Sequence, residues 1–136
     1  MLGIADADHA EYGNPSGNYL IVPVTCAVPH RAEGAPKLSG ACRVRILPGT
    51  RLFGIYGREE TSEEFFCNYE VNPHYRDALE RAGLRVTAVG EAGEVRAVEL
   101  PQHRFFLATL FQPQLRPLGE QPHPVIAAYL PSFISI

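Results

Sequence analysis

Cysteine is scarce in this sequence, and its few copies form no recognisable pair. The three cysteines, Cys26, Cys42 and Cys67, are an odd number and include no Cys-x-x-Cys motif. Such a set is not the disulfide framework of a small secreted domain, so we expect a cytoplasmic protein with free thiols. Cys26 and Cys42 lie in apolar, strand-like runs, which favours packing over chemistry for both.

The sequence also lacks a long apolar run and an excess of positive charge. No stretch approaches the roughly 20 apolar residues that span a bilayer, and residues 1–6 lack the basic start of a secretory signal. The formal net charge is −3, and the basic residues are scattered. A nucleic-acid footprint would need a basic stripe. We therefore expect no membrane span and no nucleic-acid partner.

Metal-ligand spacing is absent as well. The five histidines show no His-x-x-x-His or Cys–His pattern, so we expect no metal and no cofactor. Asp6, Asp8 and His9 could contact a metal in principle, but a solvated acidic loop is the commoner outcome for such a cluster. His123 stands between two prolines, which indicates a structural residue at the start of a helix.

The apolar content is sufficient for one packed domain, which we place at residues 1–136. Hydrophobic residues make up 46% of the 136 residues, a length typical of a single domain. Alternation and β-branched residues predict four strands, and a fifth extended segment is rich in aromatic residues. Pro23 makes the first strand an edge strand or a bulged one. The expected bounds are 19–28, 42–47, 62–71, 84–89 and 95–100, with a hairpin loop at 90–94.

Three segments carry helix signals. Thr50 can cap a short helical turn. Asn72 and Pro73 are a good N-cap and a good first residue for a helix, which Gly83 ends in the left-handed conformation. A last, apolar helix is expected at about 125–133.

The segment 105–111 is apolar almost throughout. A continuous apolar strand is typical of the centre of an α/β sheet, where both of its faces are buried. Since the chain offers few helices to cover such a strand, we expect a mixed α/β sheet with a bare apolar surface. A homodimer or higher oligomer would cover that surface. The residues expected at the interface are Phe105, Leu107, Leu110, Val125, Ile126 and Tyr129.

Three segments, in order, carry a family resemblance: residues 68–72, Asn-Tyr-Glu-Val-Asn; residues 103–114, which contain the apolar run; and residues 122–124, Pro-His-Pro. Together they resemble the glutaminase domain of CTP synthases. The first is similar to the Arg-Tyr-Glu-Val-Asn segment of that family, the second to its apolar strand ending in Phe-His-Pro-Glu, and the third to the His-Pro that opens its last helix. The chain is also similar to a group of bacterial proteins related to the C-terminal region of CTP synthase. The resemblance implies part of a flavodoxin-like, class I glutamine amidotransferase fold, of which this chain would be the later part.

The departures from that family concern its catalytic residues. The family uses a Cys–His–Glu triad, and its Gly-x-Cys-x-Gly nucleophile elbow does not occur in the 136 residues. The resemblance places Gln112 where the family has His and Gln114 where it has Glu. A glutamine amide is not a useful base. Asn68 also replaces the arginine of Arg-Tyr-Glu-Val-Asn, so the resemblance implies a degenerate domain without catalysis of its own.

Three functions remain open. The first is a binding or interaction module for glutamine or another small amide or carboxylate. The second is a glutamine-hydrolysing amidotransferase whose nucleophile half lies outside this chain, and the third is a thiol redox protein that uses Cys67. The candidate ligand-binding residues are Arg43, Asn68, Tyr69 and Glu70, with Gln112 and Gln114 at the degenerate triad positions.

Each candidate residue also has a structural interpretation. Cys67 can be a compact, half-buried strand residue. Tyr69 and Glu70 can fix the junction of a strand and a helix, and Arg43 can be an arginine on an exposed strand face. The two glutamines can be remnants on a loop at a strand end. The sequence alone leaves these alternatives open.

Overall fold

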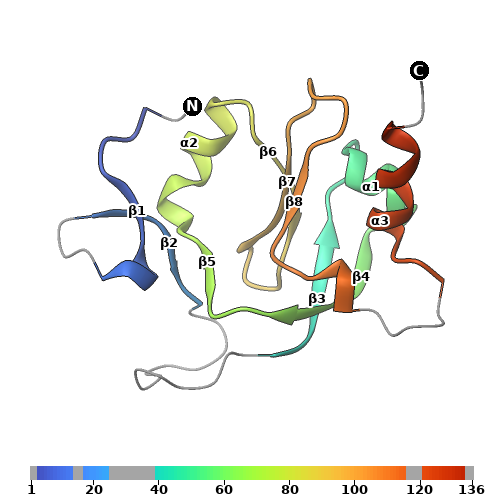
Figure 1. The fold of residues 1–136 in the computed structure, drawn as a ribbon, viewed down its shortest axis with the longest axis horizontal. Coiled ribbons are helices and arrows are strands. Elements are labelled where there is room, and N and C mark those ends of the chain that lie inside the picture. The colour runs from blue at the N-terminus through green and yellow to red at the C-terminus, as the bar shows by residue number, and fades with distance from the viewer. Residues whose placement is uncertain (1–2, 14–16, 25–38, 116–120, 134–136) are drawn as a thin grey trace.

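A computed structural model describes residues 3–13, 17–24, 39–115 and 121–133 of the chain (Figure 1). Eight strands and three short α-helices follow one another along these residues, with 3-10 turns between some of them. The strands are β1 (Ala7–His9), β2 (Asn18–Pro23), β3 (Ser39–Ile46), β4 (Glu60–Phe66), β5 (Tyr69–Val71), β6 (Arg85–Val89), β7 (Val95–Glu99) and β8 (Leu107–Thr109). The helices are α1 (Arg51–Tyr56), α2 (Arg76–Arg81) and α3 (Pro124–Tyr129).

The strands form two sheets. The larger has the order β4-β3-β6-β7-β8 and is antiparallel throughout. The smaller has the order β1-β2-β5, in which β1 and β2 are parallel. Helices α1 and α3 pack on one another beside the larger sheet, and α2 lies between the two sheets (Figure 1). The predicted mixed α/β architecture with few helices is confirmed.

The main core lies between the larger sheet and the pair α1 and α3. Its fully buried members come from β3, β6, β7, α1 and the segment after β8. These residues are Val44, Ile46, Leu52, Ala88, Ala97 and Phe111. A second, smaller core of Val86, Val89 and Val95 contacts Val71 of β5, and so connects the larger sheet with the smaller one.

The local signals in the sequence correspond to observed caps. The Thr50 hydroxyl accepts a hydrogen bond from the Phe53 N–H at 3.1 Å and so caps α1. The Asn72 side chain accepts one from the His74 N–H at 3.0 Å, at the turn that leads into α2. Gly83, with φ of 93°, follows α2 in the left-handed region. These three predictions are confirmed. Such caps can be predicted from sequence because each depends on neighbouring residues only.

The prediction of a buried central strand at 105–111 is wrong. The observed strand, β8, has only three residues and lies at the edge of the larger sheet. Ala108 is exposed, Leu107 and Thr109 are half-buried, and Phe106 is 38% exposed.

Contacts on both sides of β8 explain its shortness. The Arg51 guanidinium donates to the carbonyl oxygens of His103 and Arg104 at 2.9 and 2.7 Å and holds the preceding loop against α1. After the strand, the Thr109 hydroxyl donates to the carbonyl of Phe111 at 2.8 Å. The chain therefore turns, and Phe111 enters the core with 1% of its surface exposed.

Two further strand predictions need correction. The extended segment predicted at 62–71 is divided between β4 and β5, which belong to different sheets. The first predicted strand is not an edge strand, because β2 is the middle strand of the smaller sheet. The alternative expectation, a bulged strand, agrees with the register shift between Asp8 and His9, which leaves Leu20 of β2 as the extra residue. Pro23 is the last residue of β2 and pairs with Tyr69 in register. Residues 25–28, with Cys26, lie outside the described residues.

Candidate functional site

A cavity of about 490 Å³ opens where the larger sheet splays apart. Strand β3 pairs with β6 only at Arg45 and Ile46, so the earlier part of β3 is separated from the hairpin of β6 and β7. Residues 41–43 of β3 line one side of the cavity. Glu91, Glu94 and Arg96 of the hairpin line the other side, and Cys67 and Tyr69 lie at the junction of β4 and β5.

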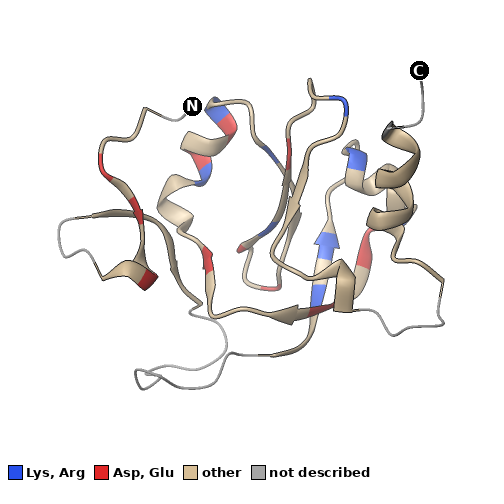
Figure 2. Cartoon of the chain, viewed as in Figure 1, with Lys and Arg blue, Asp and Glu red and all other residues tan. Residues whose placement is uncertain are grey.

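Charges of both signs line this cavity. The Arg96 guanidinium lies 2.6 Å from a Glu94 carboxylate oxygen, and each side chain is 12% exposed. Arg96 also lies 3.8 Å from the buried carboxylate of Glu70. At the mouth, Arg43 and Glu91 are 3.8 Å apart and both are well exposed. Figure 2 shows the basic residues of β3 and the acidic residues of the hairpin around this region.

Gly90 allows Glu94 to take its place in the cavity wall. Gly90 is buried, and a Cβ atom added there would clash with the Glu94 carboxylate. Glu94 Oε1 faces Arg96, and Glu94 Oε2 accepts a hydrogen bond from the Ala92 N–H at 2.9 Å. The hairpin loop therefore holds this carboxylate through a close backbone approach that a larger residue would prevent.

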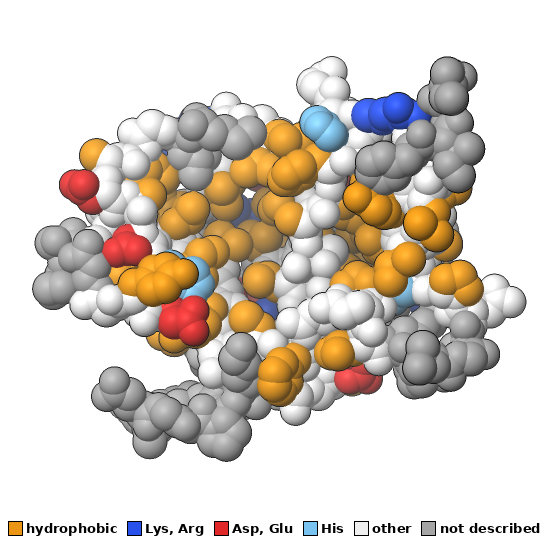
Figure 3. All heavy atoms as spheres, viewed as in Figure 1, with side chains coloured by type: hydrophobic (Ala, Val, Ile, Leu, Met, Phe, Trp, Pro, Cys, Tyr) orange, Lys and Arg blue, Asp and Glu red, His pale blue; other side chains and the backbone are white. Residues whose placement is uncertain are grey.

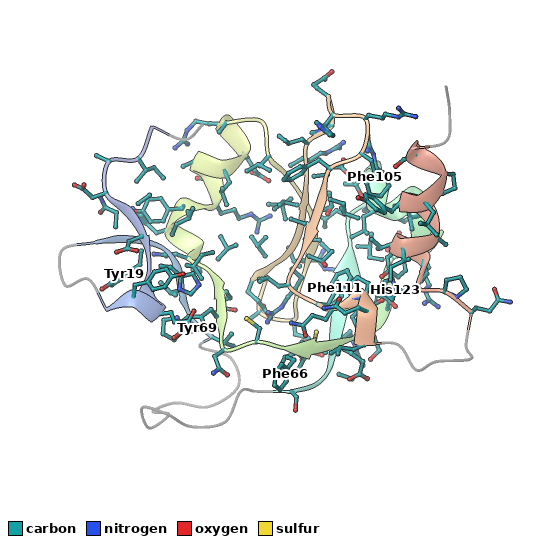
Figure 4. All side chains as sticks on the ribbon, viewed as in Figure 1. Tyr19, Phe66, Tyr69, Phe105, Phe111 and His123 are labelled. Atoms are coloured by element: carbon teal, nitrogen blue, oxygen red, sulfur yellow. The ribbon has the colours of Figure 1, made fainter. Side chains whose placement is uncertain are left out.

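The thiol of Cys67 faces the same cavity. Its sulfur accepts a hydrogen bond from the Tyr69 N–H and donates one to the Tyr69 carbonyl, both at 3.4 Å. The Tyr69 ring packs against His9 with 4.7 Å between ring centroids, and Figure 4 shows Tyr69 at the end of β5 in the smaller sheet. The structure thus brings Arg43, Cys67 and Tyr69 together around one space.

The other predicted residues have different positions. Glu70 is 2% exposed and lies behind the cavity, where it contacts Arg96. Asn68 is half-buried and is not among the lining residues.

Neither glutamine of the degenerate triad lines the cavity. The Gln112 N–H donates to the Glu64 carbonyl at 2.9 Å, and its side-chain amide donates to the Phe66 carbonyl at 3.1 Å. Its side-chain oxygen is buried without a hydrogen-bond partner among the described residues. Gln114 is exposed in a 3-10 turn. Gln112 therefore fastens the segment after β8 to the edge of β4.

A buried acid–histidine pair, which the sequence did not reveal, lies apart from the cavity. The imidazole Nε2 of His123 is 2.8 Å from the Glu63 carboxylate, and the Tyr56 hydroxyl donates to that carboxylate at 2.7 Å. Glu63 and His123 are 7% and 5% exposed. Figure 4 shows His123 near Phe111, with 6.1 Å between ring centroids.

The hydrogen bonds of this pair assign its protons. His123 Nδ1 accepts from the Val125 N–H at 3.2 Å, so the hydrogen on Nε2 is the one donated to Glu63. Burial of the Glu63 carboxyl raises its pKa, but hydrogen bonds from His123 and Tyr56 outweigh burial, and the pKa lies below its usual range. The alternation of β4 carries a signal for this site, because Glu63 shares the inward face of the strand with Thr61 and Phe65.

Among the described residues, no group of three or more His, Cys, Asp or Glu side chains is arranged to hold a metal ion. No helix in the described part of the chain is both long and apolar enough to cross a membrane.

Known proteins extend these observations. No family model matches the sequence. The CTP synthase of Aeropyrum pernix is 41% identical over 137 residues, which are 96% of this chain and 24% of that protein. The CTP synthase of Thermus thermophilus is 37% identical over 140 residues, which are 96% of this chain and 25% of that protein. The structure of the Trypanosoma brucei CTPS glutaminase domain with bound acivicin matches with a TM-score of 0.84 and 29% identity, over 97% of this chain and 52% of that one.

The chain is related to CTP synthases over nearly its whole length and has the fold of their glutaminase domain. The family resemblance and the amidotransferase-type fold class are therefore confirmed. The chain spans about a quarter of the length of the CTP synthases that it matches and about half of the solved glutaminase chain. The roles of single residues in a CTP synthase glutaminase-type site stay predictions.

Proposed function

We propose that this chain is a ligand-binding relative of the glutaminase domain that does not hydrolyse glutamine by the route of its family. The proposal rests on Gln112 and Gln114, which the resemblance places where the family has its His and Glu. Neither amide can take a proton from a nucleophile at neutral pH. The Gln112 amide is in addition bonded to the Phe66 carbonyl. A nucleophile supplied by another segment or another chain would find no base in either residue.

The cavity suits a small ligand that carries both charges. Its lining holds two arginines and two glutamates, Arg43, Arg96, Glu91 and Glu94. Arg43 is exposed, and its pair with Glu91 is long at 3.8 Å and lies in solvent, so its guanidinium is available to a carboxylate. An ammonium group would meet a glutamate on the opposite wall. Glutamine, or a related small amide or carboxylate, combines these groups, and acivicin occupies the related glutaminase domain of T. brucei CTPS.

Calorimetry with the single variant Arg43→Gln tests the binding half of the proposal. The chain should bind glutamine, and the variant should bind at least about tenfold more weakly, since a charged hydrogen bond is worth roughly 1.5–3 kcal/mol. Arg81→Gln is the matched control, because Arg81 is an exposed arginine on α2 away from the cavity. No heat of binding for glutamine, glutamate or asparagine would refute a small-ligand role for the cavity.

Ammonia release tests the catalytic half. The chain incubated with glutamine should release no more ammonia than a heat-treated sample, whereas the A. pernix CTP synthase serves as a positive control. Turnover that exceeds the heat-treated level and survives Gln112→Ala would contradict the proposal and favour the second hypothesis, an amidotransferase completed by residues outside this chain.

A thiol function of Cys67 is the second candidate, and its position in the cavity wall favours it. Two hydrogen bonds to the backbone of Tyr69 speak for a structural role as well. Labelling with iodoacetamide, followed by mass spectrometry, distinguishes a thiol function of Cys67 from a structural role. A reactive thiol should be modified at neutral pH faster than Cys42, the other free cysteine of the described residues. Equal or slower modification assigns Cys67 to packing.

A further inference from the structure

The cavity is larger than free glutamine requires. Its volume of about 490 Å³ lies in the range of roughly 300–1,000 Å³ in which pockets enclose drug-sized molecules, and glutamine is smaller than such a molecule. Part of the lining is apolar, from Val24, Phe65 and Leu110. Figure 3 shows hydrophobic side chains gathered across the middle of the face that it draws, with basic atoms visible between them. A bound glutamine would therefore leave space beside it.

A second, outer pocket adjoins the cavity. It has a volume of about 250 Å³ and is lined by Arg43, Arg45, Glu60, Gly90 and Glu91. Arg43 and Glu91 also line the cavity, so the two spaces meet at this pair of side chains. The two side chains are 67% and 75% exposed and 3.8 Å apart, and they form no closed wall between the spaces.

Strand β3 presents two arginines to the outer pocket. Arg43 and Arg45 alternate with the buried Val44, and side chains two residues apart lie on the same face of a strand, about 6.6 Å apart along it. The strand partners of Arg45 are Glu60 on one side and Val89 on the other, so both neighbouring strands hold its backbone. Its guanidinium makes no hydrogen bond or ion pair with another described residue and can bind an anionic group.

The charges of the outer pocket favour one kind of anion. Two glutamates, Glu60 and Glu91, line it together with the two arginines. A phosphate group carries about −1.5 to −2 charges and would be repelled by both glutamates. A carboxylate carries a single charge and matches the planar donors of a guanidinium, and the glutamates can accept from an amide N–H beside it. The outer pocket therefore fits a carboxylate that follows a peptide link.

We propose that the ligand of this site is a dipeptide, with its amino-terminal residue in the cavity and its terminal carboxylate in the outer pocket, between Arg43 and Arg45. This inference rests on the proposed ligand-binding function of the cavity and names the class of ligand. The ammonium group lies on the side of Glu94, and the first side chain meets the apolar lining. One added residue moves the terminal carboxylate by about 3.3–3.6 Å, which carries it from Arg43 to a point between the two arginines.

Arg45 is then the residue that distinguishes a dipeptide from an amino acid, because it lines the outer pocket and not the cavity. Calorimetry at low ionic strength, where exposed charges are least screened, tests this role. Glutaminyl-glycine should bind the wild type at least about tenfold more tightly than glutamine does, which is the effect of one charge-assisted hydrogen bond. Arg45→Gln should remove this gain and leave the binding of glutamine unchanged. Arg81→Gln is again the matched control and should bind both compounds as the wild type does.

A change in the ligand tests the same contact without a variant. Glutaminyl-glycinamide lacks the terminal carboxylate, so it should bind the wild type at least about tenfold more weakly than glutaminyl-glycine. Arg45→Gln should not weaken it further, because variant and ligand then lack the same interaction. Inorganic phosphate at equal concentration should not displace glutaminyl-glycine from the wild type. Displacement that Arg45→Gln abolishes would overturn the assignment of the outer pocket to a carboxylate.

The remaining outcomes separate this inference from the proposed function. Equal affinities for glutamine and glutaminyl-glycine, or a gain that both Arg45→Gln and the glycinamide leave intact, would overturn the dipeptide assignment, while the cavity would remain a site for glutamine. If neither compound binds, the proposed function fails and this inference fails with it. Arg45 is exposed, so Arg45→Gln should unfold at the same urea concentration as the wild type.

Discussion

Two polar clusters of this molecule are each built around a largely buried glutamate, and they differ in access. Glu63, His123 and Tyr56 form one of them, in the core between β4, α1 and α3. Glu94, Arg96 and Cys67 belong to the other, in the wall of the 490 Å³ cavity. The first contains the residue types of an acid–base catalyst, but the second is the one that a ligand can reach. Residue type alone would therefore point to the cluster that a ligand does not reach.

The hydrogen bonds explain why the buried cluster is structural. Both nitrogens of His123 are occupied, one by the Val125 N–H and the other by Glu63. Glu63 also accepts from Tyr56 and from Thr61. A buried network whose members are satisfied stabilises the packing of its elements. Here it holds the start of α3 against β4.

Removal of His123 should therefore have the largest effect on folding. His123→Ala removes a buried hydrogen bond to the Glu63 carboxylate and uncaps α3, which should lower the free energy of unfolding by about 2–4 kcal/mol. Urea denaturation followed by circular dichroism measures this change. His74→Ala, at an exposed histidine, should stay within about 0.5 kcal/mol of the wild type. A similar small effect of His123→Ala would show that the pair contributes little.

The pH dependence of stability also tests the contribution of Glu63 to the fold. The pKa of Glu63 is lower in the folded chain than in the unfolded one, so its contribution is present above the ordinary glutamate pKa of about 4.3. It is lost as the pH falls through the lower folded value. Glu63→Gln should lower stability at pH 7 by roughly 1–3 kcal/mol and should flatten the acid limb of the stability profile. An unchanged acid limb would contradict the assignment.

These clusters also show how far the sequence could predict the structure. The caps at Thr50 and Asn72 and the turn at Gly83 were predicted, because their signals lie within a few residues. The division of the segment 62–71 between two sheets was not, since Cys67 and Asn68 at the break carry no Gly or Pro signal. Location in the cytoplasm and the absence of a nucleic-acid partner stay predictions from composition.

The candidate site was predicted only in part for a similar reason. Arg43, Cys67 and Tyr69 were singled out, and the structure places all three around the cavity. Glu94 and Arg96 were missed, because they enter from a hairpin that is distant in sequence from β3 and β4. The pair of Glu63 and His123 was missed because 60 positions separate its members. Only the tertiary fold brings such residues together.

A glycine variant tests the cluster of Glu94, Arg96 and Cys67 in the cavity wall. Gly90→Ala should displace the Glu94 carboxylate and weaken its pair with Arg96, with a loss of stability of about 1 kcal/mol and weaker binding of glutamine. Gly54→Ala is the control. Gly54 is exposed in α1 with open space around it, so alanine should raise stability by roughly 0.5–1 kcal/mol. Equal effects of the two variants would show that Glu94 does not depend on the close approach at Gly90.

The smallest effect on folding is expected at the mouth of the cavity. Arg43 and Glu91 form an exposed pair at 3.8 Å, and such pairs contribute about 0–1 kcal/mol. Arg43→Gln should therefore leave the urea midpoint almost unchanged while it weakens the binding of glutamine. The comparison with His123→Ala then separates the clusters by function: one variant loses stability, and the other loses binding. A loss of stability in Arg43→Gln as large as that in His123→Ala would show that the cavity cluster, too, serves the fold.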